Sequence, residues 1–167
     1  MRSKSRMRNL GHYGLAAAVF ALDRLTKWII EQRMSVFDSH TVIPGFFDIV
    51  HAQNRGAAFS IFAESNSALR PFFLIGLSCA ALALIAWMLR NAARFDRPTA
   101  IGLSLILGGA LGNVFDRIVS GAVTDFLDFY VGDLHWPAFN VADSAIVIGS
   151  CLLLIGMLRP KQQPADA

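Results

Sequence analysis

Two acidic residues in apolar surroundings could do chemistry. Asp143 opens the run ADSAIVIGSCLLLIGM, which contains no further charge before Arg159, and Asp125 lies in the apolar segment VTDF. Two carboxylates held close together tend to share one proton, because like charges a few ångströms apart cannot both ionise. The ionised member can take a proton from water while the protonated member donates to a carbonyl oxygen. Such a pair suits peptide hydrolysis of the aspartic type.

Other acids have a cation nearby in the sequence. Asp23 precedes Lys27 by four residues, so the two share a helix face and can form an ion pair that holds helices together. Asp116 is followed by Arg117, which we expect to be its partner. The pattern alone leaves several pairs of acids possible. It favours Asp125 and Asp143 because they lack a local cation.

Asp143 also has a purely structural interpretation. Asn140 precedes it by three residues, which is the spacing of a capping box at the start of a helix. The positive end of the helix dipole favours a carboxylate at this place. The two roles are compatible, since a helix N-terminus stabilises an anion.

The composition predicts a small integral membrane protein. The 167 residues are 54% hydrophobic and 16% charged, with a mean hydropathy of +0.48. A helix that spans a bilayer needs roughly 20 mainly apolar residues. We expect an all-α membrane protein of one domain over residues 1–167, with four transmembrane helices at about residues 13–30, 69–89, 99–115 and 141–158.

The distribution of basic residues predicts the topology. Lys and Arg precede the first span, join the second to the third and follow the fourth, so the positive-inside rule places both termini in the cytoplasm. The polar residues of three spans then lie at one depth, near the outer surface. They are Asp23, Arg24, Lys27, Asn113, Asp116, Arg117, Asn140 and Asp143.

Two outer segments connect the spans. Residues 34–68 contain β-branched and aromatic runs broken at Pro44-Gly45 and near Gly56, which predicts a small extracytoplasmic β-sheet on the membrane surface. Gly56 and the two alanines after it leave the backbone accessible to an extended peptide. Residues 116–140 are rich in aromatic side chains, which predicts a short interfacial segment before the last span.

No motif indicates a metal or another cofactor. The four histidines are scattered, and Cys79 and Cys151 lie inside apolar spans. The basic residues flank spans and form no patch interleaved with aromatic residues, which argues against nucleic-acid binding. We expect a monomer that needs neither metal nor cofactor and whose partners are membrane lipid and its substrate.

Five blocks of the sequence carry a resemblance: DRLTK from Asp23, NRGAAFS from Asn54, GGALGNVFDR from Gly108, VTDF from Val123 and PAFNVADSAI from Pro137. The chain resembles the lipoprotein signal peptidases (signal peptidase II), the bacterial membrane aspartic peptidases. The resemblance implies a multi-pass protein of the inner membrane with its active site near the outer leaflet. The implied substrate is a prolipoprotein whose lipobox cysteine carries diacylglycerol, cut just before that cysteine.

The resemblance also implies roles for individual residues. Asp125 and Asp143 would be the catalytic pair, whereas Asp23, Lys27 and Asp116 are expected to be structural. Residues in or around the substrate site would be Asn54, Gly56, Asn113, Arg117 and Asn140. The sequence departs from the family pattern at Arg24, where Gln is usual, and at Arg55, where Thr is common, and this affects local contacts only.

Rival interpretations remain open at this point. A proton-coupled transporter would also bury acids in its spans. A serine/lysine peptidase would use Ser144 or Ser60 as nucleophile and Lys27 as base. A membrane scaffold would leave the apolar setting of Asp125 unexplained.

Overall fold

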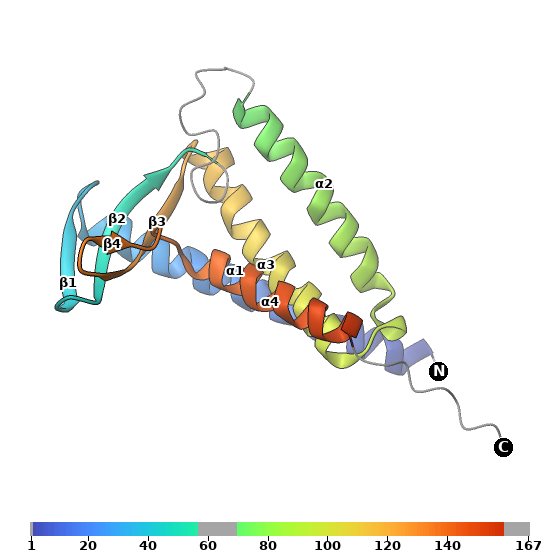
Figure 1. The fold of residues 1–167 in the computed structure, drawn as a ribbon. Helices are drawn as coiled ribbons and strands as arrows, with labels where there is room; N and C mark the ends of the chain where they lie inside the picture. The colour runs from blue at the N-terminus through green and yellow to red at the C-terminus, as the bar shows by residue number, and fades with distance from the viewer. Residues whose placement is uncertain (1, 57–69, 159–167) are drawn as a thin grey trace.

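The computed structural model describes residues 2–56 and 70–158. Four long helices form a bundle, an antiparallel sheet lies at one end of it, and the start of α1 and the end of α4 lie at the other end (Figure 1). The helices are α1 (Arg2–Arg33), α2 (Arg70–Arg90), α3 (Arg97–Val119) and α4 (Val141–Leu158), with a short 3-10 helix η2 (Ala92–Arg94). The strands are β1 (Ser39–Ile43), β2 (Phe47–Asn54), β3 (Val123–Val131) and β4 (Leu134–His135).

Helix α3 packs closely against both α1 and α4 because glycines line its contacts. A Cβ atom on Gly102 would lie 2.6 Å from the carbonyl oxygen of Gly149, and the reverse substitution gives the same 2.6 Å. A Cβ atom on Gly108 would collide with the carbonyl oxygen of Ala16 on α1. Small residues at helix contacts allow this approach in membrane proteins, where van der Waals packing drives association.

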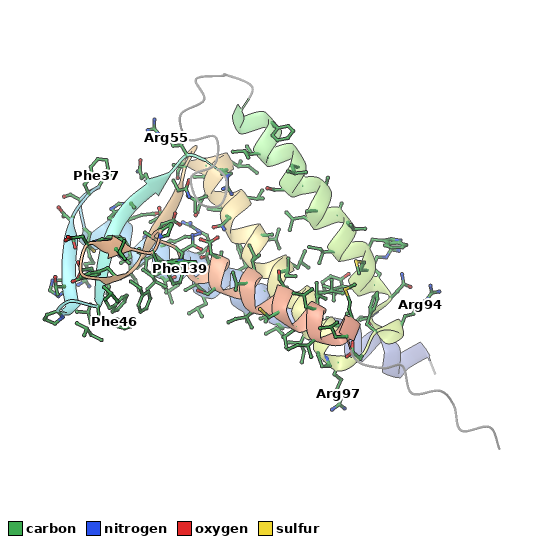
Figure 2. The ribbon with its side chains drawn as sticks, viewed as in Figure 1. Phe37, Phe46, Arg55, Arg94, Arg97 and Phe139 are labelled. Carbon is green, nitrogen blue, oxygen red and sulfur yellow. The ribbon has the colours of Figure 1, made fainter. Side chains whose placement is uncertain are left out.

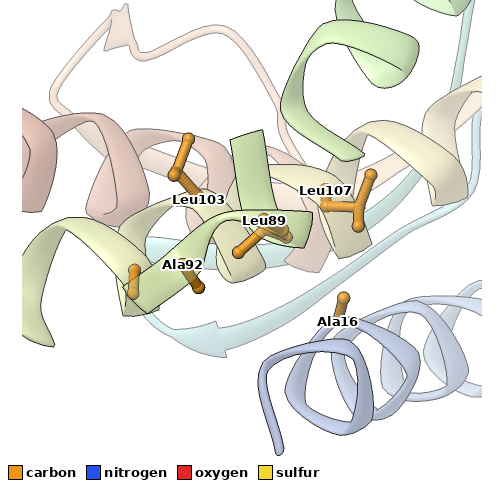
Figure 3. Close-up of a cluster of buried hydrophobic side chains, with 6 residues drawn as sticks. Ala16, Leu89, Ala92, Leu103 and Leu107 are labelled. Carbon is orange, nitrogen blue, oxygen red and sulfur yellow. The ribbon is translucent and has the colours of Figure 1, made fainter. Parts of the chain in front are cut away.

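Helix α2 runs beside α3 and meets α1 near its C-terminal end, while its start lies apart from α1 and α4 (Figure 1). At the junction, apolar side chains from α1, α2 and α3 and from η2 form a buried cluster (Figure 3). Its labelled members are Ala16, Leu89, Ala92, Leu103 and Leu107.

Three of the described helices are long and apolar enough to cross a membrane: Phe73–Arg90 within α2, and Arg97–Val119 and Val141–Leu158, which are α3 and α4. Their bounds agree with the three later predicted spans to within four residues. Large apolar side chains on these helices face outward, such as Leu84 at 57% and Leu154 at 59% exposure. Such surfaces require an apolar surrounding, which lipid supplies. Helix α1 is long enough to cross but carries charged residues.

The sheet has the order β1-β2-β3-β4 and is antiparallel throughout. The prediction of short strands in the first outer segment is confirmed by β1 and β2, which meet at the turn containing Gly45 with φ 77°. The predicted exposure of Ala57 and Ala58 and the candidate nucleophile Ser60 lie outside the described residues.

The second outer segment differs from the prediction. Residues 116–140 were expected to form only an interfacial segment, but α3 continues to Val119 and the chain then forms β3 and β4. Gly121, with φ 71°, turns the chain out of α3. Strand β3 pairs with β2, and in this register Ala52 lies opposite Asp125 and Asn54 opposite Val123. This pairing places Asp125 next to the helix bundle.

Candidate active site

Asp125 and Asp143 meet where the sheet joins the bundle. Asp125 lies on β3 and is 3% exposed, while Asp143 lies in the first turn of α4. Phe139, labelled in Figure 2 at this junction, ties the two elements together. Its carbonyl oxygen accepts from the backbone N–H groups of Phe126 (3.0 Å) and Leu127 (2.9 Å). The start of α4 is thereby fixed to β3.

Asn140 contacts both carboxylates. Its Nδ2 donates to Asp125 Oδ1 at 2.7 Å, and its Oδ1 accepts from the backbone N–H of Asp143 at 2.9 Å. Its own backbone N–H lies 3.4 Å from Asp143 Oδ2. The last two contacts form the predicted capping box, so Asp143 caps α4 and also belongs to the pair. Asn140 is completely buried, and its side chain therefore positions the acids.

Two more asparagines donate to the pair. Asn113 Nδ2 on α3 lies 2.8 Å from Asp143 Oδ1, and Asn54 Nδ2 at the end of β2 lies 3.2 Å from Asp125 Oδ2. Neither carboxylate forms an ion pair with a cation among the described residues. Three asparagines, from β2, from α3 and from the residue before α4, thus supply neutral contacts that fix two acids without neutralising them.

Burial controls the electrostatics of Asp125. Loss of solvent raises the pKa of Asp125 from 3.8 to about 7, and the nearby charge of Asp143 acts in the same direction. Hydrogen bonds from Asn54 and Asn140 and the charge of Lys27 oppose the shift. Asp125 is therefore largely protonated below neutral pH and can act as a hydrogen-bond donor or an acid there.

A cluster of charged side chains lies next to the pair of acids, Asp125 and Asp143. Lys27 is completely buried, and its Nζ contacts Asp23 Oδ2 at 2.8 Å, Asp116 Oδ2 at 2.7 Å and Asn113 Oδ1 at 2.9 Å. The predicted ion pair of Asp23 with Lys27 is confirmed. Arg24 forms a further ion pair with Asp116, so the cluster contains two acids and two cations.

The prediction that Arg117 pairs with Asp116 is wrong. Arg117 directs its guanidinium elsewhere: Nη2 donates to the carbonyl oxygen of Gly56 at 3.0 Å, and Nη1 lies 3.3 Å from that of Asn113. Gly56 is also held by its N–H, which donates to Asn54 Oδ1 at 2.9 Å. Arg117 and Asn54 thus fix the backbone directly after β2, next to Asp125.

Local patterns in the sequence do not reveal several supporting residues. Thr124, adjacent to Asp125, donates through Oγ1 to Glu31 Oε1 at 2.8 Å, and Phe139 joins β3 to the start of α4. Phe139 belongs to the PAFN segment, and nothing in that segment's composition indicates pairing with β3. Among the residues predicted to bind substrate, Asn113 and Asn140 are buried and bonded internally, while Asn54, Gly56 and Arg117 border the pair.

Known proteins match this chain over most of its length. The family model described as signal peptidase (SPase) II matches residues 15–159. A lipoprotein signal peptidase of Solibacter usitatus is 62% identical over 154 residues, covering 92% of this chain and 94% of the relative. That of Ralstonia nicotianae is 49% identical, covering 87% of this chain and 83% of the relative.

A solved structure agrees with the sequence comparison. It is described as a bacterial membrane enzyme determined by the in meso method at 2.3 Å resolution. It superposes with a TM-score of 0.81 at 31% identity, covering 93% of this chain and 94% of that chain. Membrane-spanning helices and bacterial relatives together indicate an inner-membrane protein. The chain belongs to the signal peptidase II family, the lipoprotein signal peptidases.

Proposed function

We propose that the chain is an aspartic endopeptidase that removes the signal peptide from diacylglyceryl-modified prolipoproteins by cutting just before the lipidated cysteine, with Asp125 and Asp143 as the catalytic pair. Membership of the family supports the reaction and the class of substrate. One observation carries the assignment of residues: Asn140 holds both carboxylates, and neither has a cationic partner in the described part of the chain.

The proposed mechanism divides the roles between the acids. Asp143, as the ionised member, removes a proton from the attacking water, while protonated Asp125 donates to the carbonyl oxygen of the scissile bond. The resulting tetrahedral diol then collapses. Asp125 regains its proton from a diol hydroxyl, and Asp143 passes its proton to the leaving nitrogen. The raised pKa of Asp125 supports its role as the acid.

The pH dependence of cleavage tests this division. We expect kcat/KM to fall as the pH rises through about 7, because Asp125 then loses the proton that it must donate. Replacing Asn54 by Leu removes a hydrogen bond that favours the carboxylate of Asp125, so the alkaline limb should move to higher pH. The measurement is a pH–rate profile with a substrate that does not titrate in this range.

The neighbouring position supplies the control for this test. Gln53 is exposed on β2, the same strand as Asn54. In Gln53→Ala the alkaline limb of the pH–rate profile should lie at the same pH as in the unmodified protein. A limb that moves to lower pH in Asn54→Leu, or not at all, contradicts the assignment of Asp125 as the acid.

We assign four transmembrane spans, with α1 as the first. Two of the charged residues in this span face inward, since Asp23 and Lys27 are both completely buried, and the partly buried Arg24 pairs with Asp116. Its outward side chains are apolar, with Leu22 and Leu25 each at 52% and Trp28 at 55% exposure. A span of this kind presents lipid with hydrocarbon and keeps its ionisable groups inside the bundle.

Both termini are assigned to the cytoplasm, and the sheet and the acids to the outer surface of the bilayer. Reporter fusions after Gly132, between β3 and β4, should therefore report an external location. Fusions between α2 and α3 should report a cytoplasmic one, because basic residues concentrate there. A cytoplasmic signal from Gly132 would contradict the topology and would separate the acids from a substrate at the outer surface.

This location suits a lipid-modified substrate. A diacylglyceryl cysteine sits at the bilayer surface, so its acyl chains can remain in lipid while the peptide extends over Gly56, just after β2. Arg117 and Asn54 hold Gly56 beside Asp125. One chain supplies both acids and the asparagines that hold them, so the proposed site needs no second copy, and we propose that the protein acts as a monomer.

The rival functions lack comparable support. Lys27 donates to three acceptors, whereas a lysine base must be a neutral amine, and Ser144 Oγ donates to the carbonyl oxygen of Asn140 at 3.0 Å. A proton pathway needs polar groups through the bilayer, but α4 carries no charge from Ser144 to its end. These observations disfavour a serine/lysine peptidase and a transporter.

Purified protein and a diacylglyceryl-modified precursor peptide test the function directly. Mass spectrometry should find cleavage just before the modified cysteine, undiminished by a chelator. The same peptide without the lipid should be a much poorer substrate. Absence of cleavage, or a cut at another bond, would exclude the proposed function.

A further inference from the structure

Three polar residues of α1 lie four apart on one helix face and contact three different elements. Asp23 Oδ1 accepts from the backbone N–H of Ala142 on α4 at 2.9 Å. Lys27 contacts Asn113 on α3, and Glu31 accepts from Thr124 on β3. Helix α1 holds none of the proposed catalytic groups, yet it contacts the two elements that supply the acids, β3 and α4, and also α3, which supplies Asn113.

Lys27 fixes the orientation of one amide in particular. An ammonium group has three N–H donors and no acceptor, and here the donors face Asp23, Asp116 and the Oδ1 atom of Asn113. The amide of Asn113 must therefore present oxygen to Lys27 and nitrogen to Asp143. The 2.8 Å contact from Asn113 Nδ2 to Asp143 Oδ1 is the result.

We infer that Lys27 is a positioning residue for the peptidase reaction, acting through Asn113 on Asp143. The inference rests on the proposed function, in which Asp143 activates water. It goes beyond a packing ion pair, because it assigns Lys27 an effect on turnover that requires the Asn113 side chain.

Loss of the ammonium would leave Asn113 Oδ1 with only the longer contact from Asn140 Nδ2 at 3.3 Å, so the amide of Asn113 would be held less firmly. Its oxygen could then turn toward Asp143. The oxygen and the carboxylate of Asp143 would repel each other, and Asp143 would lose the N–H donor that orients it. A hydrogen bond to a charged group affects an equilibrium or a barrier by roughly 10- to 100-fold. We expect kcat to fall by this factor in Lys27→Met, with KM little changed, since no substrate group contacts the buried Lys27.

A double-mutant cycle separates this effect from simple destabilisation. Lys27→Met, Asn113→Leu and the double variant are compared by kcat, KM and melting temperature, well below the melting temperature of each. If Lys27 acts through Asn113, the double variant should lose no more than about threefold beyond the more impaired single variant, because coupled residues are not additive. Losses that multiply would overturn the inference, as would a normal kcat in folded Lys27→Met.

Asp116→Asn is the matched control. It removes one carboxylate contact of Lys27 and leaves the contact of Lys27 with Asn113 in place, so it should lower the melting temperature and keep kcat within about threefold. If Lys27→Met is not obtained folded, the same cycle is run in an Asp23→Asn background. That background restores charge balance, leaving Asp116 with Arg24.

The same assay distinguishes failure of this inference from failure of the proposed function. If Asp143→Asn protein still cleaves the substrate, both the proposed function and this inference are wrong. If Asp143→Asn protein is inactive but the losses in kcat from Lys27→Met and Asn113→Leu multiply in the double variant, only the inference is wrong. A lysine base would also behave differently, because Lys27→Met would then lose nearly all turnover and Ser144→Ala would be inactive.

Discussion

Replacing Asp143 or Asp125 by asparagine should reduce kcat by about 10⁴-fold or more, the scale seen when a member of a catalytic unit is removed. Asn at position 143 cannot take a proton from water, and Asn at position 125 cannot pass one to the substrate. Each substitution keeps nearly the same shape, so Asn140 retains its place between the two side chains. The measurement is turnover of the lipidated precursor peptide by folded, membrane-inserted protein.

Asp128 provides a control for this experiment. It lies on the same strand as Asp125, and its carboxylate contacts His135 Nδ1 at 2.9 Å, away from Asn140. Asp128→Asn should keep near-normal turnover. Asp125→Asn should also remain stable, because it replaces a carboxyl group that is costly to ionise where it lies. Substantial turnover by either Asp125→Asn or Asp143→Asn would show that the catalytic pair has been assigned wrongly.

Local patterns in the sequence indicated the capping box and the ion pair of Asp23 with Lys27 correctly, and they favoured Asp125 and Asp143 among several possible pairs of acids. The capping box depends on a spacing of three residues, and the ion pair of Asp23 with Lys27 on a spacing of four, so both are properties of one helix. The lack of a nearby cation was equally visible for Asp125 and Asp143. These features could be predicted because each involves residues close in sequence.

Contacts between elements could not be predicted in this way. Adjacent residues on a helix do not face one another, which explains why Arg117 does not pair with Asp116 although they are neighbours. Asp116 instead meets Arg24, 92 positions away in the chain. Strand β3 was missed because its aromatic residues and acids resemble an interfacial segment, and its partner β2 lies far away in the sequence.

Removing one member of the buried charge cluster should have the largest effect on stability. Lys27→Met leaves Asp23 and Asp116 facing a single cation, Arg24, in a site from which water is excluded. Breaking a buried ion pair on one side costs about 3–5 kcal/mol. For a chain of this length the melting temperature should fall by roughly 6–20 °C, measured in detergent by a fluorescence or light-scattering melt.

A second substitution should restore much of that loss, and two versions of it separate charge from hydrogen bonding. Asp23→Asn and Asp23→Leu, each combined with Lys27→Met, both leave Asp116 and Arg24 as a balanced pair. Asparagine can still accept from the N–H of Ala142, whereas leucine leaves that N–H without its partner at the start of α4. An unsatisfied buried donor costs about 1–3 kcal/mol, so the asparagine version should melt higher. Equal melting temperatures would mean that Asp23 does not anchor α4, and double variants no more stable than Lys27→Met would mean that charge imbalance is not the cause of its instability.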